Sequence, residues 1–388
     1  MTSFSRLPAA KIFYFCWFGA LGAYLPFIGL YYRERGLGLE QIGVLVALPG
    51  LLQLVSAPLW GLLADALRVG RLLLPLAIGG TLLPVLLIGT QADFGVLVLL
   101  VALQSLMSAP VIPLADSATI RLLGSNRERY GAQRLWGSVG WGISTVLFGR
   151  LTGEAGLTAI FAGYALLAGL AAAAAVALPK ADLPQVDLRH AASTLLRDRR
   201  WRLFLGCMLL VGYGSATISS FLSLYLQDLG ASGEQIGLAF TLAGLSELPV
   251  MALSAQLLRR WGPRPLLVCA GICFALRMLI YIAAPAPEWA LAAQLMHGLC
   301  FGLLWIAGVV EAHRLAPPGL EATAQSLFGV AVSGVAAALA SAAGGQIYAV
   351  YGTAALFSCG IAAALSGALW YGLAAQEQRT KQGEPTGS

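Results

Sequence analysis

Charged residues are what this sequence has least of. Only 11% of its 388 residues are Asp, Glu, Lys or Arg, whereas 58% are hydrophobic. Soluble domains carry about 25% charged residues, and a soluble core of ordinary size cannot hide this much apolar surface. The composition excludes an ordinary soluble globular protein and indicates a chain whose solvent is lipid.

Clusters of metal ligands and catalytic nucleophiles are also missing. The chain has three histidines and six cysteines, and each cysteine lies inside an apolar run. Cys269 and Cys273 are one helical turn apart, but no histidine or carboxylate accompanies them, so we expect packing thiols, no disulfide and no metal. Neither a nucleotide-binding loop nor a nucleophile with its base is found. We therefore expect neither an enzyme nor an ATP-driven pump, and no cofactor.

Long apolar runs dominate instead. A membrane-spanning helix needs about 20 mostly apolar residues, and the first run, from Ile12 onward, is too long for a cleavable signal. The sequence therefore predicts an all-α membrane protein with twelve transmembrane helices. The predicted spans are 11–32, 42–66, 72–90, 95–118, 132–152, 156–178, 202–227, 236–258, 264–284, 289–313, 321–349 and 351–374.

Lys and Arg lie almost wholly on one side of these spans. If the N-terminus is cytoplasmic, the outer segments hold only Arg33, Arg35 and Arg150, while the inner segments hold nearly all the other basic residues. This asymmetry predicts an inner-membrane protein with both termini in the cytoplasm. It also accounts for the net charge of +6 without a nucleic-acid partner. We expect a monomer in the lipid bilayer.

The two halves of the chain are similar to each other. "LYYRERGLGLEQIG" (30–43) is echoed by "LYLQDLGASGEQIG" (224–237), each following the first span of a half. Two parallel halves of six helices resemble the major facilitator superfamily, which implies a substrate site between two pseudo-symmetric bundles. The predicted parts are an N-terminal bundle 1–178, a cytoplasmic linker 179–201, a C-terminal bundle 202–374 and a cytoplasmic tail 375–388.

The loop after the second span resembles the loop signature of the same superfamily. "GLLADALRVGRLL" places Gly61 four residues before Asp65, with Arg68 and Arg71 following. Such an acid can receive an arginine or a helix N-terminus and lock one conformation, so these residues are a candidate gating loop. A solvated loop acid is the alternative. The second half has Arg259 where the repeat would place Asp65.

Ionisable residues inside the spans are few, and such residues are costly and usually functional. Glu247 lies halfway along its span, so a proton or substrate site is expected there. Arg277 must meet a carboxylate or water. His297 is equally well explained as a hydrogen-bonding residue between helices, and Glu311 is expected at the interface because Arg314 follows on the same face. The set inside the spans is Asp116, Arg134, Glu247, Arg277 and His297.

The charges of this set balance. Asp116 and Glu247 offset Arg134 and Arg277, so the set can exchange a proton against a bound anion. A buried carboxylate without a cation tends to bind a proton, because desolvation penalises its charged form. This balance indicates proton-coupled transport.

Three stretches carry a closer resemblance. "YGAQRLWGSVGWG" (130–142) resembles the fifth helix of the lactose permease family of oligosaccharide/proton symporters, and more closely that of the phenylpropionate permease family. "PLADSA" (113–118) and "QLMHGLCFG" (294–302) resemble their fourth and tenth helices.

The resemblance implies roles for the residues at matching positions. Asp116 and Arg134 would hold the substrate, Trp141 would stack on it, and Glu247 would join the substrate and proton sites. Arg277 and His297 would couple proton and substrate. Cys300 stands where lactose permease has a protonatable glutamate. Glu247 is therefore the first candidate for the proton site, with Asp116 second.

The substrate class is read from two side chains. Trp141 offers a flat face to a ring, and the Arg134 fork suits a carboxylate or hydroxyls. We expect a proton symporter that imports a small aromatic carboxylic acid, such as a phenylpropionate, by alternating access. A sugar or nucleoside symporter, with Asp116 accepting from hydroxyls, is the first alternative. A drug/proton efflux antiporter is the second, although Arg134 and Arg277 argue mildly against it.

Overall fold

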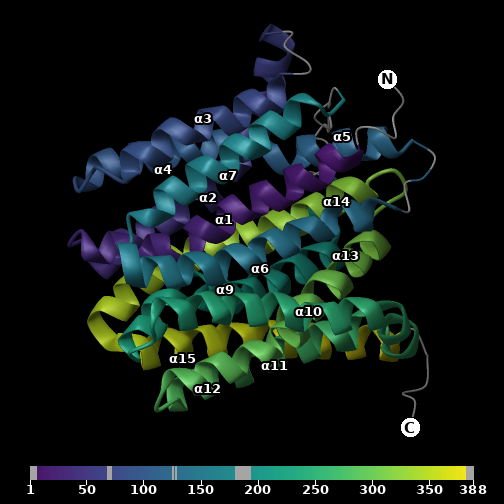
Figure 1. Ribbon diagram of the computed structural model, residues 1–388. Coiled ribbons are helices and arrows are strands. Elements are labelled where there is room, and N and C mark those ends of the chain that lie inside the picture. The colour runs from purple at the N-terminus through teal and green to yellow at the C-terminus, as the bar shows by residue number, and fades with distance from the viewer. Residues whose placement is uncertain (1–6, 68–71, 125, 127–128, 180–193, 382–388) are drawn as a thin grey trace. The chain divides into compact units, whose positions relative to one another are not determined.

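The computed structural model describes residues 7–67, 72–124, 126, 129–179 and 194–381, and these residues form helices with no strand among them (Figure 1). The helices are α1 (Leu7–Glu34), α2 (Leu39–Leu67), α3 (Leu73–Ile88), α4 (Phe94–Ser108), α5 (Val111–Leu123), α6 (Tyr130–Ala155), α7 (Ala159–Val176), α9 (Arg199–Asp228), α10 (Gly233–Trp261), α11 (Pro263–Ala283), α12 (Pro287–Ala293), α13 (Leu303–Leu315), α14 (Glu321–Gly329) and α15 (Ala336–Lys381). A 3₁₀ turn (Gln294–Met296) and a π-helix (Gly298–Gly302) join α12 to α13, and a second π-helix (Val330–Val335) joins α14 to α15.

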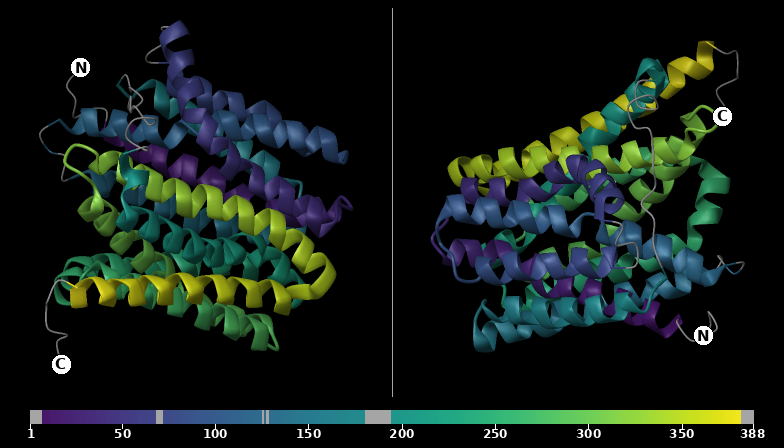
Figure 2. Two further views of the ribbon diagram at one scale, coloured as in Figure 1. Left: turned by 180° about the vertical axis from the view of Figure 1, so that it is seen from behind. Right: turned by 90° about the horizontal axis from the view of Figure 1, so that it is seen from above.

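Each of the twelve predicted spans corresponds to one of these helices, to consecutive helices, or to one arm of α15. Within the described residues, eight helical stretches are long and apolar enough to cross a bilayer. The longest, Thr323–Ala374, contains two predicted spans, because Gly352 adopts a left-handed conformation with φ of 79° and reverses the chain (Figure 2). The all-α multi-span prediction is confirmed.

The predicted fourth span is divided where the sequence reads as one run. α4 ends before Ala109 and α5 begins after Pro110. Proline has no N–H to continue the helical hydrogen bonds and its ring crowds the preceding turn. The break places Asp116 on α5, a separate helix that runs on to Leu123.

The internal repeat is visible in the local structure of two turns. Gly36 and Gly230 occupy equivalent positions after α1 and α9, and both adopt φ of 85°. Gln41 and Gln235 occupy equivalent positions at the start of the next helices. Their side-chain oxygens accept hydrogen bonds from the backbone N–H three residues earlier, at 3.1 and 2.9 Å. The repeated letters therefore encode the same turn and the same N-terminal cap.

The chain divides into two compact units. The first comprises residues 1–185 and 223–241, and the second comprises residues 186–222 and 242–388. The predicted linker falls mostly on residues 180–193, which lie outside the described part, as do the last residues of the predicted tail, 382–388. The boundaries given from the sequence for the two bundles stay predictions.

Backbone contact between α1 and α6 organises the first unit. A Cβ atom at Gly140 would collide with the carbonyl oxygen of Phe15, and one at Gly22 would lie 2.9 Å from that of Trp141. Small residues let membrane helices approach closely, where van der Waals packing replaces the missing hydrophobic driving force. The glycines of α6 therefore fix the position of the helix that carries Arg134 and Trp141.

We expect Gly140→Ala to destabilise the protein by about 1–3 kcal/mol, the usual cost of overpacking. The added methyl group would meet the Phe15 backbone rather than a movable side chain. Gly153→Ala is the matched control, because that glycine also lies in α6 and has open space around it. Thermal unfolding in one detergent would measure both, and equal midpoints for the two variants would contradict the expectation.

Candidate functional site

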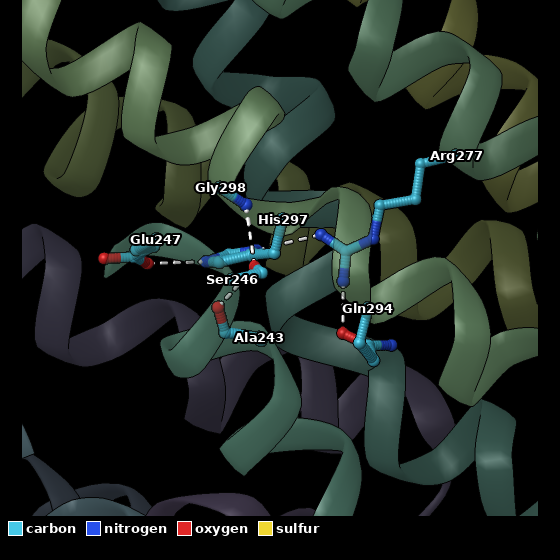
Figure 3. Close-up of polar contacts among 7 residues, drawn as sticks. All are labelled: Ala243, Ser246, Glu247, Arg277, Gln294, His297 and Gly298. Atoms are coloured by element: carbon cyan, nitrogen blue, oxygen red, sulfur yellow. Dashed lines mark hydrogen bonds and ion pairs between the residues drawn. The ribbon is translucent and has the colours of Figure 1, made fainter. Parts of the chain in front are cut away.

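Four polar side chains of the second unit lie in a row inside the predicted spans (Figure 3). The Glu247 carboxylate oxygen Oε1 on α10 lies 3.0 Å from Nε2 of His297. On the other side of the imidazole, Nδ1 lies 2.9 Å from a terminal nitrogen of Arg277 on α11. A second terminal nitrogen of the same guanidinium donates to Oε1 of Gln294. The structure therefore brings together all three residues predicted to couple the proton.

The partners of Arg277 differ from the carboxylate or water expected from the sequence. The side chain is buried, with 1% of its surface exposed, and it forms no ion pair with a carboxylate of the described chain. Its Nε donates to the hydroxyl of Tyr281 at 2.7 Å, so its nitrogens contact Tyr281, Gln294 and His297. Acceptors satisfy a buried guanidinium, and neutral ones add no second charge that must be desolvated.

An irregular backbone places His297 between α10 and α11. The residue lies between the 3₁₀ turn and the π-helix that precede α13. The N–H of Gly298 donates to the Ser246 hydroxyl at 2.9 Å, and this hydroxyl donates to the Ala243 carbonyl at 2.7 Å (Figure 3). A Cβ at Gly298 would collide with the Ser246 carbonyl. π-helical turns are frequent at functional sites, and this one lets His297 approach Glu247.

The imidazole ring is also held by a stack of aromatic rings. His297 and Phe301 are nearly parallel, with centroids 5.5 Å apart. Trp305 continues the stack at 5.8 Å from Phe301. The spacing of four residues puts all three rings on one helical face. The plane of the His297 ring is thus fixed by packing as well as by hydrogen bonds.

The first unit holds a second polar group around Asp116. The Tyr14 hydroxyl of α1 donates to this carboxylate at 2.6 Å. Tyr130, at the start of α6, interacts with the same carboxylate. Arg134 places its guanidinium 3.9 Å from the centroid of Phe18 and 5.7 Å from that of Tyr14. Among the described residues Arg134 forms no ion pair, and Tyr14 contacts both its guanidinium and the Asp116 carboxylate.

Trp141 lies two turns further along α6 and has a different neighbour. Its ring meets Phe240 edge-on, with centroids 6.4 Å apart. Residues 233–241 belong to the same compact unit as α6, and the Thr145 and Thr241 hydroxyls are 2.7 Å apart there. Arg134 and Trp141 therefore project from one helix towards α1 and α10 respectively.

The predicted gating loop is only partly described. Gly61 and Asp65 lie near the end of α2, where the backbone alone is described, and Arg68 and Arg71 lie outside the described residues. Among the residues that the structure describes, no group of three or more His, Cys, Asp or Glu side chains is arranged to hold a metal ion. The gating role stays a prediction.

Sequence reasoning missed the neutral members of the site. Tyr281 follows Arg277 by four residues and Gln294 precedes His297 by three, so helical spacing alone could have placed both near the charged pair. Tyr14 and Ser246 have no such signal. They meet Asp116 and Gly298 across 102 and 52 residues of sequence.

Comparison with known proteins identifies the family of the chain. The profile of the MFS_1 like family matches residues 7–359. The maltose permease of Geobacillus stearothermophilus is 32% identical over 358 residues, which cover 89% of this chain and 90% of that protein. The probable 3-phenylpropionic acid transporter of Escherichia coli (strain K12) is 29% identical over 306 residues, which cover 76% of this chain and 79% of that protein.

A solved structure shares the fold. The crystal structure of the nucleoside transporter NupG superposes with a TM-score of 0.83 at 16% identity, over 95% of this chain and 98% of that chain. At this identity the likeness concerns the fold alone. With the helical architecture and the match over nearly the whole chain, the protein is a multi-pass membrane transporter, not an enzyme, and belongs to the MFS_1 like family of the major facilitator superfamily.

Proposed function

We propose that the protein is a proton-coupled symporter that imports a small aromatic carboxylate by alternating access, without a cofactor. The observation that supports this substrate class is that Arg134 lacks a carboxylate partner in the described part of the chain. Its guanidinium lies on the face of Phe18 and has no carboxylate partner among the described residues. A cation inside a membrane span is costly without a partner, and a carboxylate substrate would supply that partner together with a ring for Trp141.

Proton coupling is supported by the Glu247 cluster. The Glu247 side chain keeps 20% of its surface exposed, and its carboxylate contacts Nε2 of His297. A carboxylate inside a predicted span that contacts one imidazole is a candidate proton site. Cys300 is buried in the π-helix, at the position where lactose permease has a protonatable glutamate. A buried thiol is a poor proton carrier.

A sugar is the second candidate substrate, favoured by the 32% identity to a maltose permease. Asp116 would accept from a sugar hydroxyl, with Tyr14 and Tyr130 beside it. In that case Arg134 would donate to hydroxyls rather than to a carboxylate. The two substrates differ in one respect that can be measured, the need for a negative charge.

The deciding experiment measures ligand-induced thermal stabilisation of purified protein. The ligands are 3-phenylpropionate, its uncharged carboxamide, and maltose. Stabilisation by the carboxylate but not by the carboxamide supports the aromatic acid. Stabilisation by maltose alone supports the sugar and overturns the first proposal. Acidification of the vesicle interior, or alkalinisation outside, during uptake of the active ligand then tests symport.

We expect Arg134→Lys to weaken binding of the carboxylate by roughly 10- to 100-fold. A charge-assisted hydrogen bond is worth about 1.5–3 kcal/mol, each 1.4 kcal/mol is about tenfold, and lysine cannot reproduce the planar fork. Arg150→Lys, in the same helix but 66% exposed, is the control and should change little. Equal affinity for the carboxylate in both variants would remove Arg134 from the binding site.

The orientation belongs to the same proposal. We place the protein in the inner membrane as a monomer with both termini in the cytoplasm, on the strength of the Lys and Arg asymmetry. Asp65, Arg68 and Arg71 then lie on the cytoplasmic side, where they would gate the pathway. A C-terminal reporter active only in the cytoplasm tests this topology.

A further inference from the structure

The His297 ring lies between a permanent cation and a carboxylate, and this fixes which of its nitrogens carries the proton. Arg277 has only N–H donors and stays protonated in proteins. Its 2.9 Å contact with Nδ1 of His297 therefore requires Nδ1 to accept. The proton of the neutral ring then lies on Nε2, which donates to Glu247 at 3.0 Å (Figure 3).

A second proton on this ring is disfavoured by the same geometry. Protonation of Nδ1 would set an N–H against an N–H and a cation against a cation at 2.9 Å. The charged groups that face the ring are Glu247 from α10 and Arg277 from α11, and the Cys300 thiol of the π-helix interacts with the guanidinium. While Arg277 holds this position, Glu247 is the member of the cluster left to gain and lose a proton.

The position of Arg277 depends on two neutral residues. The Tyr281 hydroxyl accepts from the Arg277 Nε at 2.7 Å and from the Gln294 amide nitrogen at 2.9 Å. The same amide nitrogen also contacts the Ala290 carbonyl at 3.2 Å, which leaves the amide oxygen for the guanidinium. Arg277, Tyr281 and Gln294 thus form a closed ring of hydrogen bonds, with Gln294 fully buried.

Packing holds the hydrogen-bonded group of Arg277, Tyr281 and Gln294 in place. Tyr281 is 1% exposed, and its ring packs against Phe357 of α15 at 5.3 Å. Buried polar networks that are fully satisfied tend to hold one arrangement, because any other leaves a donor without a partner in a low-dielectric interior. The guanidinium is therefore aimed at Nδ1 of His297 by groups that do not themselves carry charge.

We propose that Tyr281 and Gln294 are positioning residues, which hold Arg277 on Nδ1 of His297 so that this histidine remains the neutral Nε2–H tautomer and Glu247 alone carries the proton. Only the last clause rests on the proposed proton coupling. The tautomer of His297 can be read without substrate or transport, so the two proposals can fail separately.

The test uses nitrogen NMR of full-length protein labelled at histidine, in lipid nanodiscs. The chain has three histidines, His190, His297 and His313, and loss of one signal in His297→Gln identifies the resonance. In the unmodified protein we expect His297 to remain the Nε2–H tautomer across about pH 5–8, the range in which histidines titrate. Titration of His297 in step with His313, or an Nδ1–H tautomer, would overturn the proposal.

Two substitutions test the positioning role. Tyr281→Phe keeps the ring on Phe357 and removes only the oxygen, and Gln294→Leu removes the amide. In each we expect His297 to acquire a protonation step that the unmodified protein lacks. Tyr164→Phe is the matched control, because it removes another buried hydroxyl, bonded to Thr81 at 2.9 Å, and should leave His297 unchanged. If neither substitution changes the titration of His297, the positioning role is refuted.

Infrared spectroscopy separately tests the last clause. A protonated carboxyl group has its own carbonyl band, which should grow on acidification and lose one component in Glu247→Gln. If a titrating band of equal size persists in that variant, another carboxyl group carries the proton, and the tautomer assignment of His297 is untouched.

Discussion

Glu247→Gln is expected to abolish accumulation of substrate against its gradient while leaving exchange of substrate across the membrane intact. The amide oxygen of glutamine can still accept from Nε2 of His297, so the contact at 3.0 Å survives. The side chain can no longer release or bind a proton. With the membrane potential clamped at zero, each proton moved with substrate supports about tenfold accumulation per unit of pH gradient. We expect the ratio to fall from about tenfold to one.

Uptake and counterflow in proteoliposomes measure the two activities separately. Glu34→Gln is the matched control, because it makes the same chemical change at an exposed position near the end of α1 and should retain accumulation. Accumulation retained by Glu247→Gln would assign the proton to another residue. Asp116 is then the next to test, since it is the second candidate for the proton site.

The fold was predictable from the sequence because its signals are long. An apolar run of about 20 residues has few structural solutions, so all twelve spans are found among the helices. The repeat at 30–43 and 224–237 even marks equivalent turns, with Gly36 and Gly230 at the same φ. The π-helix after His297 was not predictable, because its cause is a close approach of Gly298 to α10, which no local pattern encodes.

The site was predictable only in its charged members. Glu247, Arg277 and His297 were found because an ionisable group in lipid is costly, and the structure brings the three together. Tyr281 and Gln294 carry no such cost when hydrogen-bonded, so only their helical spacing from Arg277 and His297 separates them from ordinary polar residues. The expectation that Arg277 needs a carboxylate or water overlooked neutral acceptors.

The position of Glu311 was also not predictable from the sequence. The sequence places it at the membrane interface with Arg314, but its side chain is 0% exposed. Its carboxylate accepts from Arg264 Nε at 2.9 Å and from the Tyr371 hydroxyl at 2.7 Å. Arg314 is 3.8 Å away and 63% exposed, so its contribution is small. The Arg264–Glu311 pair joins α11 to α13, and the Tyr371 hydrogen bond joins α15 to both.

We expect Glu311→Met to destabilise the protein by roughly 3 kcal/mol, because removal of one partner leaves the other charge without compensation. Breaking a buried ion pair costs about 3–5 kcal/mol. The low end applies here because Arg264 keeps 22% of its side chain exposed. Replacement of both partners by apolar groups of similar size is often nearly neutral. Arg264→Met combined with Glu311→Met should therefore be more stable than Glu311→Met alone.

A double-mutant cycle followed by thermal unfolding in one detergent measures this coupling. Arg314→Met is the control for loss of a basic residue from the same end of α13, and it should leave the unfolding midpoint nearly unchanged. If the double variant is as unstable as the sum of the single variants, Glu311 and Arg264 stabilise the fold independently. The uncompensated charge would then not be the cause of the loss, and the Tyr371 hydrogen bond, tested by Tyr371→Phe, would have to account for it.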